Sequence, residues 1–214
     1  MRIRLAALAL AVSLIPLTAF AADPPKTRTF TFENDAIGKP PAGFEFARTG
    51  RGAEGKWTVE LERGGKSHVL LQSSADRTDY RFPVAIVRDE SRRDVTLTVR
   101  ARPLQGEVDQ GFGLVWRYRD ADNYYITRCN ALEDNCTIYH VVNGSRRPFK
   151  NQNVKVATNT WHTLKMEARG NHFVVWFDGQ KVLDAHDDTF QAGRVGLWTK
   201  ADSVIEFDDL TIAP

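Results

Sequence analysis

The sequence predicts an all-β protein, built as an antiparallel sandwich, from two patterns that run along most of its length. Apolar residues alternate with polar ones in segments 57–62, 95–101 and 164–168, which is typical of half-buried strands. Turn-forming pairs such as Asn143-Gly144 and Asp178-Gly179 separate such segments, and they suit two-residue hairpins because both central positions need φ > 0. Since no long window has helical spacing, we expect about thirteen short strands in a sandwich or barrel.

The first 21 residues have the pattern of a secretory signal peptide. Arg2 and Arg4 supply a positive start, an apolar run covers residues 5–17, and residues 19–21 (Ala-Phe-Ala) match a cleavage site. The alternative, a membrane anchor, needs about 20 apolar residues, and this run is shorter. We therefore expect cleavage after Ala21, a periplasmic or secreted protein, and no membrane attachment after cleavage.

The rest of the chain is expected to form one domain. Residues 22–27 predict a flexible lead-in, and residues 28–214 predict a single β-sandwich because they contain no linker, repeat or low-complexity tract. The chain has 29 basic and 27 acidic residues, and loss of Arg2 and Arg4 with the signal peptide brings the net charge to zero. Nucleic-acid binders need a surplus of Lys and Arg, so no nucleic-acid partner is expected, and the Arg146-Arg147 pair is interpreted as a solvated loop.

Cys129 and Cys136 predict a disulfide, because exported chains fold in an oxidising compartment. The alternative, a zinc site, lacks a paired His motif. If the two cysteines lie opposite each other in a hairpin, Tyr125 faces His140 across the strands.

This register divides the hairpin side chains between two faces. The more apolar face, expected to be the core, carries Tyr124, Ile126, Tyr139 and Val141. The face expected to hold the disulfide carries Tyr125, Thr127 and His140. A simple hairpin to residues 112–118 places Arg117 opposite Tyr125 and adds Trp116 and Tyr118 to the core face, although a one-residue slip would exchange the two sets.

The last strand is expected to contain a β-bulge at Asp208-Asp209. Ile205 and Phe207 have one parity, Leu210 and Ile212 have the other, and one extra residue would bring both pairs to the same face. The two aspartates also suggest a calcium site together with residues of the first strand. The candidate ligands are Asp208, Asp209, Glu33 and Asp35. Because calcium takes six to eight oxygens, the alternative is a bulge whose side chains cap backbone donors.

Several segments resemble a known family. They are residues 30–35, 38–44, 57–59, 113–125, 193–203 and 207–210. Together they resemble the laminin-G-like branch of the concanavalin A-like lectin and glucanase superfamily, whose bacterial exported members are grouped with 3-keto-disaccharide hydrolase-like domains. The resemblance covers nearly the whole mature chain. It implies a two-sheet jelly roll that binds glycans on its concave sheet.

The same superfamily includes glucanases, so a catalytic carboxylate pair was sought. Glu107 and Asp109 resemble the start of the glucanase signature, but Gln110, Gly111 and Phe112 follow where the further glutamate is needed. Since glycoside hydrolysis usually needs two carboxylates, residues 104–110 are interpreted as a polar loop.

Aromatic residues suggest where a sugar would bind, because sugars stack on Trp and Tyr rings while planar polar groups hold their hydroxyls. Trp57, Trp116 and Trp161 are expected in the core. In segment 195–198, alternation places Trp198 on the other face with Lys200. The predicted platform is Trp198, Tyr125, His140, Arg117 and Lys200. The alternative for Trp198 is packing in a second layer of the sandwich or under a loop.

The sequence therefore favours a non-catalytic, glycan-binding domain. One alternative is a glycoside hydrolase acting on 3-keto-glycosides, and another is a structural or interaction domain of the cell envelope. Calcium is the one cofactor that the residues suggest.

Overall fold

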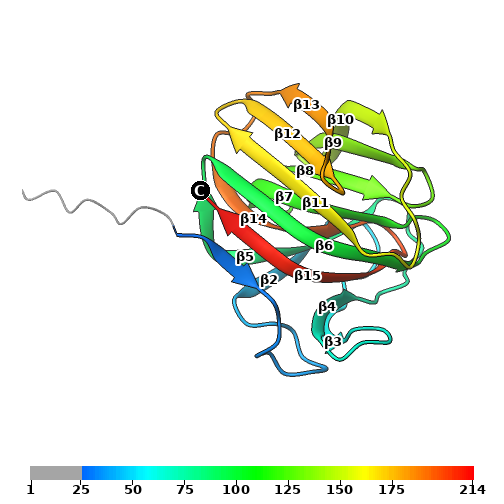
Figure 1. Ribbon diagram of the computed structural model, residues 1–214. Coiled ribbons are helices and arrows are strands. Elements are labelled where there is room, and N and C mark those ends of the chain that lie inside the picture. The colour runs from blue at the N-terminus through cyan, green and yellow to red at the C-terminus, as the bar shows by residue number, and fades with distance from the viewer. Residues whose placement is uncertain (1–25) are drawn as a thin grey trace, which may run out of the picture.

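The computed structural model describes residues 26–214, so the expected signal peptide lies outside the described residues. Fifteen strands and no helix are found in this part of the chain, and none of its segments forms a helix that could cross a membrane. The strands form two antiparallel sheets, with β6, β11, β12 and β15 in the layer nearer the viewer in Figure 1. The prediction of an all-β, two-sheet antiparallel sandwich is confirmed.

The first sheet has eight strands, of which β1 pairs with β15 beside the main path. In spatial order they are β13 (Gln180–His186), β12 (His172–Phe177), β11 (His162–Arg169), β6 (Val95–Gln105), β15 (Val204–Ala213), β4 (His68–Gln72) and β3 (Trp57–Leu61), with β1 (Arg28–Phe30). The second sheet has seven strands in one path. In spatial order they are β10 (Ser145–Asn153), β9 (Asn135–Val142), β8 (Asn123–Asn130), β7 (Gly111–Asp120), β14 (Gly193–Thr199), β5 (Arg81–Arg92) and β2 (Phe44–Gly50).

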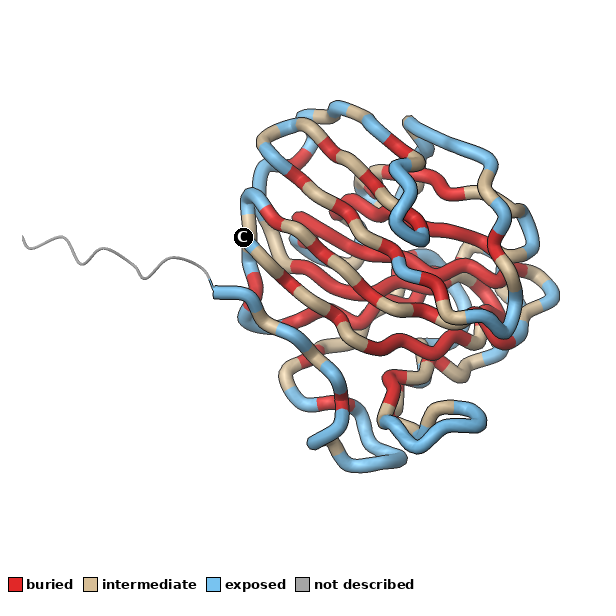
Figure 2. Tube along the Cα trace, in the orientation of Figure 1, coloured by how far each residue is buried: buried red, intermediate tan, exposed pale blue. Residues whose placement is uncertain are grey.

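The main hydrophobic core lies between the two sheets and follows from the alternation of each strand. In β6, Val95, Leu97 and Val99 are buried, while the intervening Thr96 and Thr98 are only partly so. Figure 2 shows this banding along the eight-stranded sheet, whereas the central strands β7 and β8 of the seven-stranded sheet are buried almost continuously. The middle of the second sheet is therefore covered on both faces.

A second cluster of buried apolar residues explains this, because it lies on the face of the seven-stranded sheet that points away from the main core. Its members are Phe82, Val84, Ile86, Val115, Tyr118, Tyr124, Ile126, Tyr139, Val141 and Trp198. Tyr125, Cys129, Cys136 and Ile138 belong instead to the core between the sheets. The predicted assignment of the hairpin faces is therefore wrong, because both faces of β8 are buried and neither is the solvent face.

The predicted register of the hairpin is confirmed, with Tyr125 opposite His140 and Cys129 opposite Cys136. The predicted register of the preceding strand is wrong, because Trp116, and not Arg117, lies opposite Tyr125. A register shift follows Trp116, and Arg117 has a φ of 51°. The shift is a bulge, so Trp116 enters the main core whereas Tyr118 joins the outer cluster.

The outer cluster is buried because the seven-stranded sheet curls strongly over it. The Thr49 hydroxyl of β2 lies 2.7 Å from the Tyr124 hydroxyl of β8, although three strands separate β2 from β8. In a flat sheet these strands would be at least roughly 19 Å apart. The Tyr80 hydroxyl, just before β5, likewise donates to the Gly144 carbonyl in the β9–β10 turn at 2.8 Å. Opposite corners of the sheet therefore meet, and its outer face is concave.

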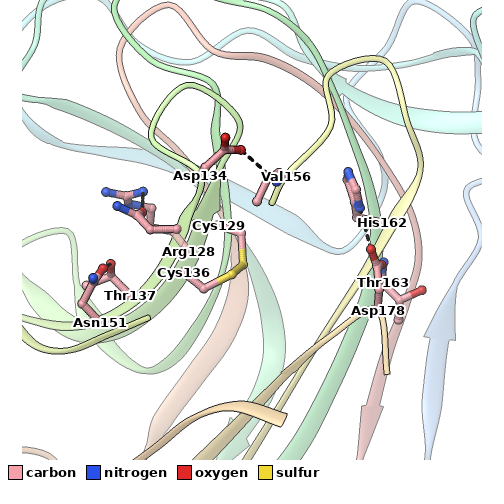
Figure 3. The surroundings of a disulfide bond; sticks show 11 residues. Arg128, Cys129, Asp134, Cys136, Thr137, Asn151, Val156, His162, Thr163 and Asp178 are labelled. Atoms are coloured by element: carbon pink, nitrogen blue, oxygen red, sulfur yellow. Dashed lines mark hydrogen bonds and ion pairs between the residues drawn. A yellow bond between two sulfur atoms is a disulfide. The ribbon is translucent and has the colours of Figure 1, made fainter. Parts of the chain in front are cut away.

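Two further local predictions are confirmed. Cys129 and Cys136 form a disulfide between β8 and β9, and both residues are buried in the main core (Figure 3). The register of β15 against β6 shifts between Asp208 and Thr211, and Asp209 has a φ of 52°, which marks the expected bulge.

Candidate functional site

The predicted sugar platform is not an exposed surface. Trp198 is fully buried in the outer cluster and stacks on Phe82 with ring centroids 5.3 Å apart. The alternative prediction, packing of Trp198 in a second layer, is therefore confirmed. Lys200 does lie near Trp198 on this side of the sheet, with 13% of its side chain exposed.

Two other platform residues are structural parts of the main core. The Tyr125 hydroxyl donates to an Asp187 carboxylate oxygen and accepts the backbone N–H of Phe190. Arg117 is 1% exposed, and its guanidinium donates to backbone carbonyls of neighbouring turns. The prediction of an exposed platform is wrong for both residues. His140 is partly exposed, 3.5 Å from Asp187, and its contact with a ligand stays a prediction.

The tryptophans are divided differently from the prediction. Trp57 and Trp116 are buried, as expected, but Trp161 is partly exposed and lies under the guanidinium groups of Arg100 and Arg102. Trp176, which the sequence analysis did not single out, is also partly exposed and carries Lys165 over its ring. The signal was available, because Val175 and Phe177 fill the main core and alternation places Trp176 outside.

The four predicted calcium ligands make separate contacts. Asp35 accepts the N–H of Ala42, Glu33 accepts that of His68, and the two aspartates of the bulge pair with Arg100. Burial raises the pKa of Asp208 to about 6, and its carboxylate accepts the N–H of Asp209. These contacts match the capping alternative.

A different group could hold a metal ion. Across residues 26–214, the three side chains whose ligand atoms gather within 4.8 Å are His172, Asp184 and His186. His172 and His186 are opposite each other on β12 and β13. The Asp184 carboxylate already pairs with His172 at 2.8 Å and with Lys181 at 3.1 Å, so protein groups satisfy it in this structure.

The concave face carries a group of charged side chains, several of which are buried. We call this group the charged cluster; it consists of Asp79, Asp109, Arg128, Glu133, Arg146 and Lys200. Its members come from six places: β8, β10, the turn after β8, the residues before β5, the residues before β7, and the residue after β14. Charged groups that are buried together in a concavity are candidates for a functional site.

Lys200 joins two carboxylates at the rim of this cluster. Its ammonium lies 2.7 Å from Asp79 and 2.9 Å from Asp109. Burial raises the pKa of Asp109, although Lys200 opposes the shift, and Asn130 donates to the same carboxylate at 2.9 Å. Burial therefore makes the Asp109 carboxyl hold its proton more tightly than an ordinary aspartate does.

Hydrogen bonds to Asp202 fix the loop that carries Asp109. The Asp202 carboxylate accepts the backbone N–H groups of Glu107, Val108 and Asp109 at 2.8 to 3.1 Å. Gly106 opens this loop with a φ of 149°, where a Cβ would collide with the Asp109 carbonyl. The same loop lines a depression of about 510 Å³. The interpretation of residues 104–110 as a merely polar loop missed this anchored position of Asp109.

All but one of the guanidinium nitrogens of Arg128 have a hydrogen-bond partner. Its guanidinium donates to Glu133 at 2.6 Å and to Asn135 at 2.7 Å, and to the Tyr139 hydroxyl at 3.0 Å. Its Nε atom is buried and has no hydrogen-bond partner among the described residues. The position of Arg128 could have been predicted from the alternation of β8, because residues 124, 126 and 128 point to the same face of the strand.

Arg146 lies on an aromatic floor. Its guanidinium carbon is 4.4 Å from the Phe82 ring centroid, 4.5 Å from that of Tyr139 and 5.5 Å from that of Trp198. Burial lowers the pKa of Arg146, and its Nη1 atom is buried without a hydrogen-bond partner in the described chain. The prediction of a solvated loop at Arg146 is therefore wrong: the residue is in β10, opposite Val141.

Comparison with known proteins identifies the family. The profile described as "3-keto-alpha-glucoside-1,2-lyase-like domain" matches residues 38–213. The chain belongs to this family. Among curated proteins, the family member is 26% identical over 148 residues to a levanase of Bacillus subtilis (strain 168), which covers 67% of this chain and 20% of the levanase. The chain thus spans about a fifth of that relative's length.

Solved structures share the fold of this family member. The carbohydrate binding module CBM66 from Bacillus subtilis is similar with a TM-score of 0.63 and 23% identity, over 79% of this chain and 95% of the module. A winged bean acidic lectin complexed with methyl-alpha-D-galactose is similar with a TM-score of 0.57 and 11% identity, over 87% of this chain and 98% of the lectin. Both likenesses agree with the jelly-roll, concanavalin A-like fold that the resemblance implied.

Proposed function

We propose that this protein is a carbohydrate-binding domain and that the charged cluster on the concave face holds the glycan. The observation that supports this most is the pair of buried donors without partners, Arg128 Nε and Arg146 Nη1, beside one aromatic floor. A buried donor that lacks an acceptor is costly, and a sugar hydroxyl is an acceptor of suitable size.

The rim of the cluster is open to an incoming ligand. The side chains of Asp79 and Glu133 are 74% and 42% exposed, and Lys200 lies between the rim and the buried Asp109. Carboxylates and an ammonium at such a rim can each bond two adjacent hydroxyls of a sugar ring. The fold is that of a binding module and of a lectin that holds a galactoside, which supports the same proposal.

The test is a titration of purified protein with a panel of neutral and acidic oligosaccharides, including fructans, by calorimetry. Lys200→Met is expected to weaken binding about tenfold or more, because it removes a charged hydrogen-bond donor at the rim. The matched control is Lys165→Met, which removes an ammonium that lies over the Trp176 ring on the opposite sheet. Absence of binding to every sugar of the panel would refute the proposal. A loss of affinity in Lys165→Met with none in Lys200→Met would also refute it.

A second candidate function is turnover of a 3-keto-glycoside, which the family membership and the raised pKa of Asp109 favour. A carboxylate can take a proton from the carbon beside a ketone, while a neighbouring ammonium stabilises the negative oxygen that results. Incubation with a 3-keto-glucoside separates the two functions. Product formation that is lost in Asp109→Asn would favour the second, and binding without turnover would favour the first.

We also propose that the domain works in the periplasm or outside the cell. The buried disulfide supports an oxidising compartment, as does the match to a levanase. Mass spectrometry of the protein from a fractionated culture should find an N-terminus at Ala22, and an unprocessed cytoplasmic form would contradict this.

A further inference from the structure

Arg146 differs from the other charged members of the cluster, because it alone has no partner of opposite charge. Lys200 contacts Asp79 and Asp109, and Arg128 contacts Glu133, each at 2.9 Å or less. In the chain from residue 26 onward, no carboxylate comes within 4 Å of the Arg146 guanidinium, and its side chain donates no hydrogen bond. Asp109 attracts Arg146 from a greater distance, but Lys200 holds Asp109.

We infer that the charged cluster selects glycans that carry a carboxylate, and that this carboxylate pairs with the guanidinium of Arg146. The inference rests on the proposed function, since it names the class of sugar that the concave face takes. It fits uronic acids, whose carboxylate lies on the edge of a sugar ring that also offers an apolar face.

The geometry of Arg146 suits this partner. A guanidinium is a planar fork of donors that matches the two oxygens of a carboxylate. The guanidinium carbon of Arg146 lies over the rings of Phe82, Tyr139 and Trp198, which leave its N–H donors without a carboxylate or carbonyl acceptor, so these donors are the part left to bind a ligand. Arg146 keeps partial solvent exposure, which gives a ligand access to that edge.

The surroundings also explain why a neutral sugar would serve less well. A buried cation is costly unless an anion offsets it, and the neighbouring Arg128 repels Arg146 further. The aromatic rings return part of this cost, but they do not neutralise the charge. A carboxylate would give the third cation of the cluster an ion pair, as Lys200 and Arg128 already have, whereas a hydroxyl would supply an acceptor without a charge.

The test compares trigalacturonic acid with its methyl ester, because esterification removes the charge and keeps the sugar. The wild-type protein is expected to bind the acid about tenfold or more tightly than the ester, and sodium chloride should reduce that preference. Arg146→Gln should lower the affinity for the acid about tenfold more than it lowers the affinity for the ester, so that the preference for the acid disappears. Arg146→Lys should restore only part of it, since an ammonium cannot form the fork.

The matched control is Arg147→Gln, which changes the adjacent arginine of β10, an exposed residue opposite His140. It should keep the full preference for the acid. Thermal unfolding of each variant checks that it folds. Equal binding of acid and ester by the wild type, or an equal loss of both in Arg146→Gln, would overturn the inference while leaving the proposed function intact. Absence of binding to either, and to the neutral panel, would instead overturn the proposed function.

Discussion

Two arginines on the seven-stranded sheet, the buried Arg117 and the partly exposed Arg146, should respond in opposite ways to replacement by methionine. The guanidinium of Arg117 donates two hydrogen bonds to the backbone carbonyl of Arg93, at 3.0 and 3.2 Å. It also donates to the carbonyl of Phe190 at 2.6 Å and to that of Gly170. The guanidinium of Arg146 donates to no protein group that the structure describes. Burial lowers the pKa of both, so the cost of desolvation acts on each and only the partners differ.

The magnitudes follow from those partners. Arg117→Met removes the guanidinium from three carbonyls, of which that of Phe190 accepts a buried bond, and loss of such charged bonds is expected to reduce the free energy of unfolding by about 3 to 5 kcal/mol. Arg146→Met loses cation–π contacts of about 1 to 2 kcal/mol but regains a desolvation cost of several kcal/mol. Since methionine also packs well against rings, this variant should be about 1 kcal/mol more stable than wild type.

Urea unfolding followed by Trp fluorescence measures both variants on one scale, provided that the slopes agree. The expected separation between the two is about 4 kcal/mol or more. If Arg146→Met loses as much stability as Arg117→Met, then Arg146 has a structural partner in solution and the idea that it awaits a ligand fails. If Arg117→Met is as stable as wild type, the carbonyl contacts contribute little and the comparison itself is invalid.

Three further predictions concern stability. Replacing Cys129 and Cys136 together by Ala should cost about 2.5 kcal/mol, because the short loop regains entropy when unfolded; reduction of the wild type in urea should match it, and an unchanged midpoint would contradict it. Asp208→Asn should raise the free energy of unfolding at pH 7 to 8 by up to about 3 kcal/mol. The reason is that the Asp208 carboxyl binds its proton more tightly in the folded state than in the unfolded state, so the wild type loses stability as the pH rises from about 4 to 6. The gain should vanish below pH 4, and a gain that is independent of pH would refute the cause. Trp198→Ala should cost about 3 to 5 kcal/mol, whereas Trp176→Ala, on the partly exposed face, should cost less than about 1 kcal/mol by the same denaturation assay.

Local patterns in the sequence were enough to predict the strands and several details of their pairing. The disulfide and the register between β8 and β9 follow from Cys129 and Cys136, because antiparallel pairing relates every position of a hairpin to one known pair. The bulge at Asp208-Asp209 follows from a change of parity within one strand. Each of these needs only neighbouring residues and the two-residue repeat of a strand.

The site could be predicted only in part. Trp198 and Lys200 were assigned correctly to one side of the seven-stranded sheet, but Trp198 is buried, and Arg146 was interpreted as part of a solvated loop. The register predicted for Arg117 is wrong because β7 has a bulge there, and the apolar residues of that strand do not change parity in a way that would reveal it. Alternation separates two faces of a strand, but it does not say what covers either face.

What the sequence by itself determined is therefore most of the strands and the hairpin that the disulfide joins. What only the tertiary structure decided is which faces are interior and where charge gathers. The curvature of the seven-stranded sheet brings Thr49 into contact with Tyr124, which is 75 positions away in the chain. The same curvature covers the outer face of the sheet with residues from its edge strands. Contacts of that range depend on the summed twist of several strands, which no local pattern of residues encodes.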